Sequence, residues 1–336
     1  MATRKTSAID TLFRSMEKLN VLVIGDVMLD AYLWGNVDRI SPEAPVPIVS
    51  IRKKENRLGG AANVAINVRA LGATPLLCSV IGSDTNGRDF IELMQQLGLS
   101  TEGIVQSPDR PTTVKTRVIG NNHQMLRVDE ESDSDIPVAE RKQLLGRIES
   151  FLDVRKVDVI VFEDYDKGII NKALIEAVVR MARSRHIPVA VDPKKRNFNH
   201  YRNVTLLKPN LKELREGMKL DLDKNDLNAI SSAVRKLCKD LQLGSVLLTL
   251  SEKGILHSDG TEELLVPAHI RNIADVSGAG DTVISVAACC LALGVSPTLL
   301  SSLSNLAGGL VCESVGVVPV DKEQLFREAK RLKLGA

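Results

Sequence analysis

The sequence has few aromatic residues, and its cysteines follow no recognisable pattern. Phe, Trp and Tyr make up 3% of the 336 residues, which argues against an aromatic platform for stacking nucleic-acid bases. The five cysteines show no C-x-x-C spacing, so a metal site built from thiolates is not indicated. Scattered thiols are typical of buried positions in a reducing compartment, and we therefore expect a cytoplasmic protein.

Charge and hydropathy exclude further classes of protein. The net charge is +2 at pH 7, so neither a basic nucleic-acid surface nor a polybasic membrane patch is indicated. Hydrophobic residues make up 44% and charged residues 26% of the chain, as in an ordinary globular protein. Residues 1–20 lack the apolar stretch of a signal peptide, and no later stretch approaches a charge-free membrane span.

Short β-branched stretches alternate with amphipathic ones along the chain. The predicted strands are residues 21–24, 157–162, 188–191, 205–207 and 245–249. Apolar residues at helical spacing occur in residues 171–185 and 227–241. This alternation predicts an α/β fold with a doubly wound, mostly parallel sheet that has helices on both faces.

A polar residue follows each predicted strand within three residues. These residues are Asp26, Asp164, Asp192, Asn210 and Ser251. Ligands of doubly wound sheets bind beyond the carboxyl ends of the strands, so we expect these side chains to line one site.

Two stretches interrupt the alternation of strands and helices. Residues 31–55 contain three closely spaced prolines and an alternating apolar run, and residues 111–130 contain two more such runs. We expect these segments to form a small β-sheet lid over the site, apart from the main sheet. One face of such a sheet needs cover, which a second copy of the chain can provide in a homodimer.

A glycine-rich turn precedes an apolar, helix-compatible stretch near the end of the chain. Gly278, Ala279 and Gly280 allow several backbone N–H groups to point at one spot, and the following helix adds the positive end of its dipole. Asp281 places a carboxylate beside that spot, which suits phosphoryl transfer to a hydroxyl with Asp281 as the base. The alternative is an ordinary glycine turn in which Asp281 caps the helix.

A second pair of glycines, Gly59 and Gly60, opens a predicted helix that ends near residue 71. The glycines permit close approach of a ligand to the backbone, and Asn63 offers an amide for hydroxyl groups. The alternative is a loop that merely leads into a helix.

Together, the two glycine motifs resemble those of the ribokinase-like (PfkB) family of sugar kinases, in order and in separation. The resemblance extends from about residue 21 to about residue 319. Segments 25–30, 39–47, 191–194 and 207–213 are similar to those of the heptose-7-phosphate kinases of lipopolysaccharide-core biosynthesis.

The resemblance implies a ribokinase-like fold and a defined reaction. The γ-phosphate of ATP would pass to the anomeric C1 hydroxyl of D-glycero-D-manno-heptose 7-phosphate and give the 1,7-bisphosphate. In this family Asp281 corresponds to the catalytic base, and the backbone of Gly278, Ala279 and Gly280 forms the anion hole. This agrees with the residues themselves, because phosphoryl transfer depends mainly on positioning and charge neutralisation.

Nucleotide and metal sites are also implied by the resemblance. Asn210 and Glu213 match an N-x-x-E element that supports Mg²⁺ through water, although the same pair can form a helix capping box. Nucleotide contacts correspond to Thr249, Ser251, Gly254 and Asn305. A monovalent-cation site, taken by K⁺ in related kinases, corresponds to Asp275, Ser277, Ser314 and Gly316.

The sugar site is the third implied by the resemblance. Hydroxyl-binding positions correspond to Asp26, Asp30, Gly59, Gly60 and Asn63, with Asp164 and Asp192 beside them. A substrate phosphate also needs cations away from the catalytic end, for which the candidates are Arg117, Arg127, Lys167 and Lys194.

Some features depart from the heptose-kinase pattern. Asp166 stands where heptose kinases tend to have glycine, which adds a negative charge to the substrate loop. The H-x-G-H motif of a fused nucleotidylyltransferase is absent from the sequence, so we expect a single kinase domain over residues 1–336. The alternatives are another ribokinase-like sugar kinase and, from a different class, a sugar-binding protein without catalysis.

Overall fold

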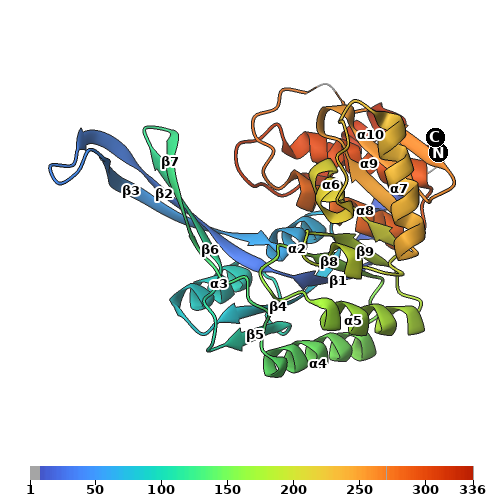
Figure 1. The fold of residues 1–336 in the computed structure, drawn as a ribbon, viewed down its shortest axis with the longest axis horizontal. Coiled ribbons are helices and arrows are strands. Elements are labelled where there is room, and N and C mark those ends of the chain that lie inside the picture. The colour runs from blue at the N-terminus through green and yellow to red at the C-terminus, as the bar shows by residue number, and fades with distance from the viewer. Residues whose placement is uncertain (1–7, 270, 336) are drawn as a thin grey trace, which may run out of the picture.

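The computed structural model describes residues 8–269 and 271–335, and in these ranges nine strands form one sheet (Figure 1). In spatial order they are β13 (Glu263–Val266), β12 (Ile255–Ser258), β11 (Ser245–Thr249), β10 (Leu206–Leu207), β9 (Val189–Asp192), β8 (Val159–Glu163), β1 (Asn20–Gly25), β4 (Thr74–Gly82) and β5 (Ile104–Ser107). The strands from β11 to β5 pair in parallel, whereas β12 is antiparallel to both of its neighbours.

Helices cover both faces of this sheet. One face carries α1 (Ala8–Met16), α2 (Ala61–Ala70), α3 (Thr85–Gln96), α8 (Ala279–Ala292), α9 (Pro297–Val311) and α10 (Lys322–Arg331). The other carries α4 (Val138–Val154), α5 (Lys172–Ser184), α6 (Leu211–Met218) and α7 (Leu227–Leu241). Alternate residues of β1 enter the two cores, Val21 and Val23 the first, Leu22 and Ile24 the second.

These observations confirm the predicted doubly wound fold. All five strands predicted from β-branched stretches occur and pair in parallel, whereas β4, β5, β12 and β13 lie outside the predicted strands. The two predicted helices correspond to α5 and α7.

A second sheet projects from the body of the molecule as an arm (Figure 1). Its strands, in spatial order, are β3 (Pro47–Gly60), β2 (Val27–Ile40), β6 (Val114–Gly120) and β7 (His123–Glu130). This arm, which we call the lid sheet, is built from the two segments that were expected to form it. It begins one residue after β1 and leads back into α2, so its base lies where the main sheet presents its carboxyl ends.

Two other sequence features can be compared with the structure. All five cysteines are buried, as expected of unpaired structural thiols. Within the described ranges, every helix is too short or too polar to cross a membrane.

Candidate active site

The carboxylate of Asp281 lies in the first turn of α8, almost completely buried. Two side chains hold it from different elements. Asn63 Nδ2, in α2, donates to Asp281 Oδ2 at 2.7 Å, and Tyr165 Oη, after β8, donates to Asp281 Oδ1 at 3.0 Å. Asp281 is therefore fixed in orientation by two neutral donors, which leaves it free to accept a proton.

The amino end of α8 has the geometry expected of an anion site. Gly278 adopts φ of 77°, which a side chain would disfavour, and within the described residues no side chain caps the helix. A Cβ atom on Gly280 would lie 3.6 Å from Lys208 Nζ, so this turn faces a buried ammonium group. The amide of Ala279 donates to Val276 O at 3.3 Å, and the start of the helix, its dipole and a lysine thus converge beside Asp281.

Three carboxylates meet at this point, and we call them the acidic cluster. Glu163 ends β8, Asp192 ends β9, and Asp281 starts α8; one oxygen of each lies within 4.8 Å of the others. Both oxygens of Glu163 are buried without a hydrogen-bond partner in the described structure. Burial, followed by the charges of Asp192 and Asp281, raises the pKa of Glu163 well above its usual value.

Two lysines compensate part of this negative charge. Lys208 Nζ lies 2.8 Å from Asp192 Oδ2, and Lys194 Nζ lies 3.6 Å from Asp192 Oδ1. Burial opposes ionisation of Asp192, but the two lysines outweigh it and lower the pKa of this carboxyl. Asp192 and Lys208 therefore form a buried ion pair next to the carboxylate of Glu163.

The acidic cluster suits a hard divalent cation. Mg²⁺ prefers oxygen ligands and is usually held by one or two carboxylates together with substrate phosphates. Both oxygens of Glu163 and Asp192 Oδ1 accept no hydrogen bond in the described structure, so they can serve as such ligands. They belong to the cluster that includes Asp281, at the start of α8. The residues present therefore fit Mg²⁺.

The environment of Asp281 predicts a pH-dependent rate. Burial raises the pKa of Asp281 to about 6. The base is active only when ionised, so kcat should fall about tenfold per pH unit below about pH 6 and level off above it. Steady-state kcat measured between about pH 5 and 8, with circular dichroism to verify folding, tests this. A rate that stays flat down to about pH 5 would contradict it.

Part of the predicted sugar site assembles at the base of the lid sheet. Asp30, in β2, is paired with Arg117, in β6, at 2.5 Å between Oδ1 and Nη1. A Cβ atom on Gly59 would lie 2.4 Å from Asp30 Oδ2, so glycine is needed there for this close approach. Gly60 has φ of 61° and precedes α2, which carries Asn63 to Asp281.

Two predicted sugar ligands face inward instead. The fully buried carboxylate of Asp26 accepts from the backbone amides of Tyr165, Lys167 and Ile169. Asp164 accepts from Tyr201 Oη at 2.6 Å and from Asn197 Nδ2 at 3.0 Å. This geometry favours a structural role for both carboxylates, because they fold the loop that carries Tyr165.

Of the four predicted phosphate-binding cations, Arg117 and Arg127 are directly paired across β6 and β7, whereas Lys194 lies apart from them. Arg127 lies on the exposed strand β7 and pairs with Asp129, while Lys167 pairs with Glu131 at 2.7 Å. Lys194 contacts Asp192 and Glu213, beside the acidic cluster rather than away from it. The geometry therefore does not support Lys194 as a ligand of a remote substrate phosphate.

The predicted nucleotide residues lie along neighbouring strands. Asn210 and Glu213 form the capping box of α6, and Glu213 also accepts from Lys194, so both of its oxygens are engaged. Thr249 pairs with Asn210 in an isolated parallel bridge. Ser251 and Gly254, both with positive φ, shape the turn that follows.

The remaining predicted residues lie near the amino end of α8 and along α9. Asp275 accepts from the backbone amides of Ser277 and Gly316, and Ser314 donates its amide to Val311 O. Asp275 thus joins Ser277 and Gly316, whereas the contact of Ser314 is a local turn at the end of α9. Asn305, in α9, donates to the carbonyl of Pro267.

Comparison with known proteins is consistent with this architecture. The pfkB family carbohydrate kinase profile matches residues 18–323. The bifunctional protein HldE of Geobacter sulfurreducens is 37% identical over 318 residues, which cover 94% of this chain and 64% of that protein. The HldE of Magnetococcus marinus is 40% identical over 323 residues, covering 95% and 65%. This chain therefore spans slightly less than two thirds of the length of these two relatives.

Solved structures show the same fold at lower identity. Phosphofructokinase-2 from Escherichia coli in complex with potassium superposes with a TM-score of 0.75 and 18% identity, covering 94% of this chain and 99% of that one. Arabidopsis thaliana ribokinase complexed with ribose and ATP gives a TM-score of 0.70 and 16% identity, covering 92% and 99%.

The family match defines a kinase that transfers phosphate to an alcohol group of a sugar. The chain belongs to the pfkB family of carbohydrate kinases. ATP, usually with Mg²⁺, is the phosphoryl donor that this family implies.

Proposed function

We propose that this protein phosphorylates the anomeric C1 hydroxyl of D-glycero-D-manno-heptose 7-phosphate with ATP, giving the 1,7-bisphosphate in the synthesis of the lipopolysaccharide core. The observation that carries the choice of sugar is the 37–40% identity to HldE proteins over nearly the whole chain. Ribokinase and phosphofructokinase-2 are less than 20% identical, so they support the fold alone.

In the proposed reaction, Asp281 accepts the proton of the sugar hydroxyl as the bond to the γ-phosphorus forms. Asn63 and Tyr165 keep the carboxylate turned toward the acceptor. The amides of Gly278, Ala279 and Gly280 donate to the oxygens of the migrating phosphoryl group.

Cations complete the proposed nucleotide site. Mg²⁺, when bound, neutralises phosphate charge, and Glu163 and Asp192 are its proposed ligands, with Glu213 contributing through water. Thr249, Ser251, Gly254 and Asn305 are proposed to surround the nucleotide. Asp275, Ser277, Ser314 and Gly316 are proposed to hold K⁺, which has been seen in a complex of phosphofructokinase-2.

Two arginines are proposed to bind the 7-phosphate. Arg117 and Arg127 are directly paired across β6 and β7, so their side chains share one face of the lid sheet. Each arginine pairs with a carboxylate, Arg117 with Asp30 and Arg127 with Asp129, and a phosphate between them would accept from the remaining guanidinium N–H groups of both. Asp30 would then orient the neighbouring hydroxyls.

Mass analysis of the product tests the proposed substrate. The protein is incubated with ATP and, separately, heptose 7-phosphate, fructose 6-phosphate or ribose. We expect a bisphosphate from the heptose at the highest kcat/KM. Preferred use of an unphosphorylated sugar would reject the heptose phosphate and leave another ribokinase-like activity.

Removing either arginine should weaken sugar binding selectively. Arg117→Ala is expected to raise KM for heptose 7-phosphate about tenfold, as the loss of one charged hydrogen bond of about 1.5–3 kcal/mol implies, and KM for ATP much less. Arg127→Ala should act in the same direction but more weakly, because its side chain is 52% exposed. Arg39→Ala, at the far end of the lid sheet, is the control. Equal increases in both KM values would argue against a phosphate site here.

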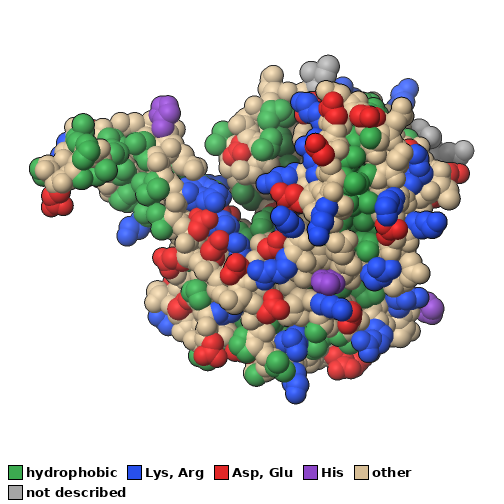
Figure 2. Space-filling view, in the orientation of Figure 1, with side chains coloured by type: hydrophobic (Ala, Val, Ile, Leu, Met, Phe, Trp, Pro, Cys, Tyr) green, Lys and Arg blue, Asp and Glu red, His purple; other side chains and the backbone are tan. Residues whose placement is uncertain are grey.

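The lid sheet is also proposed to mediate a homodimer. Met125, Leu126 and Val128 on β7 are 42%, 56% and 46% exposed, and hydrophobic side chains gather on the arm (Figure 2). Leu126→Asp should convert a dimer to a monomer in analytical ultracentrifugation, whereas Gln143→Asp on α4 should not. A wild-type protein that sediments as a monomer would contradict the proposal.

A further inference from the structure

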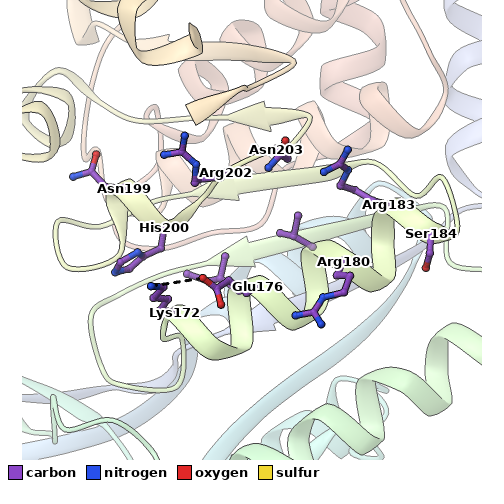
Figure 3. Close-up of a pocket in the computed structure, with 11 residues that line it drawn as sticks. Lys172, Glu176, Arg180, Arg183, Ser184, Asn199, His200, Arg202 and Asn203 are labelled. Atoms are coloured by element: carbon purple, nitrogen blue, oxygen red, sulfur yellow. Dashed lines mark ion pairs between the residues drawn. The ribbon is translucent and has the colours of Figure 1, made fainter. Parts of the chain in front are cut away.

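A pocket of about 880 Å³ lies between α5 and residues 199–203, outside the candidate active site. Side chains of α5 form one wall, and those of the segment that follows β9 form the opposite wall (Figure 3). Its volume is within the range of small-molecule sites. Its lining shares no residue with the acidic cluster or the lid sheet.

The charged groups of this pocket are mostly cationic. Lys172, Arg180, Arg183 and Arg202 line it together with His200, and Glu176 is the one carboxylate among the lining residues. Lys172 Nζ lies 3.8 Å from Glu176. The net charge of the whole chain is only +2, so a generally basic composition does not explain why four basic side chains line one pocket.

Two of these cations are not paired with a carboxylate in the described part of the chain. Arg180 and Arg183 make no ion pair or side-chain hydrogen bond within the described residues, although they lie one turn apart on the same wall (Figure 3). Arg202 is turned toward the carbonyl of Asp240 at 2.6 Å. Arginines left unpaired around a concavity have the forked geometry that binds phosphate with two hydrogen bonds.

Apolar side chains also line the pocket. Ile175 and Val179 are among the lining residues and belong to the core beneath α5. A ligand with an uncharged body and terminal phosphate groups matches this combination better than a simple ion or an acidic peptide. We propose that the pocket binds a phosphate-bearing small molecule at a site separate from that of catalysis.

Calorimetric titration with inorganic tripolyphosphate tests the charged half of this site. We compare the wild-type chain, the Arg180→Ala/Arg183→Ala variant and a control, Arg14→Ala/Arg327→Ala, which removes two exposed arginines from α1 and α10. The first variant should bind at least about tenfold more weakly, whereas the control should bind as the wild type does. Tripolyphosphate bound at the catalytic site would appear as a second class of sites with the same affinity in all three proteins.

Three outcomes of these titrations would contradict the proposal. Equal binding by all three proteins in every class of sites would overturn it, and so would an equal loss in the control, since that indicates unspecific attraction. Competition by a polyglutamate peptide of the same charge, as effective as tripolyphosphate, would show a general anionic surface instead. Unchanged kcat of the Arg180→Ala/Arg183→Ala variant verifies that it is folded.

Discussion

Replacing Asp281 by asparagine is expected to lower kcat at least about a hundredfold, the contribution of a positioned general base. The amide has nearly the same shape, and the site should keep its geometry, because the amide oxygen can accept from Asn63 Nδ2 while the amide nitrogen donates to Tyr165 Oη, a hydroxyl that can also accept. It cannot accept a proton from the sugar hydroxyl. Affinity for ATP, measured by calorimetry, should change little, because the base touches the acceptor rather than the nucleotide.

Thermal unfolding separates this loss of activity from a loss of structure. Asp281 is one of three buried carboxylates, and removing one negative charge relieves repulsion from Glu163 and Asp192. The melting temperature should therefore be equal or higher. Asp321→Asn, at the exposed cap of α10, is the matched control and should retain full activity. Near-normal turnover of the Asp281 variant would remove this residue from its proposed role.

Local sequence patterns predicted most of what is local in the structure. The apolar spacing of residues 227–241 coincides with α7, which begins after its Asp226 cap. The alternating runs in 31–55 and 111–130 occur in the lid sheet, because alternation reflects a sheet with two different faces. In both cases the spacing of apolar residues in the sequence follows from the geometry of the helix or the strand itself.

Contacts between elements that lie far apart in the sequence could not be predicted from the sequence. Glu163 and Tyr165 matter because β8 and β9 end beside the start of α8, a relation that no single segment encodes. One signal was available: Glu163 is a charged residue directly after an apolar strand. The inward orientation of Asp26 was equally hidden, since it depends on three amides about 140 residues away.

The ion pair of Lys208 and Asp192 should have the largest effect on stability. Both side chains are buried, and Lys208 Nζ lies 2.8 Å from Asp192 Oδ2. Burial disfavours the ammonium form, yet the charges of Asp192 and Glu213 raise the pKa of Lys208 above its usual value. Lys208→Met should therefore lower the free energy of unfolding by about 3 kcal/mol, because the buried Asp192 carboxylate then keeps only the ammonium of Lys194, 3.6 Å from its Oδ1, as a compensating charge.

A double substitution distinguishes this charge effect from a loss of packing. Lys208→Met/Asp192→Asn removes both charges and keeps both volumes, so most of the lost stability should return. Urea unfolding of the wild type, both single variants and the double variant gives the coupling energy. If the double variant is as unstable as the sum of the singles, the pair contributes through shape alone. Activity should stay low in both variants that lack Lys208, since its ammonium group faces the turn of Gly280 that is proposed to bind the migrating phosphoryl group. It should also stay low in Asp192→Asn, since Asp192 is a proposed ligand of Mg²⁺.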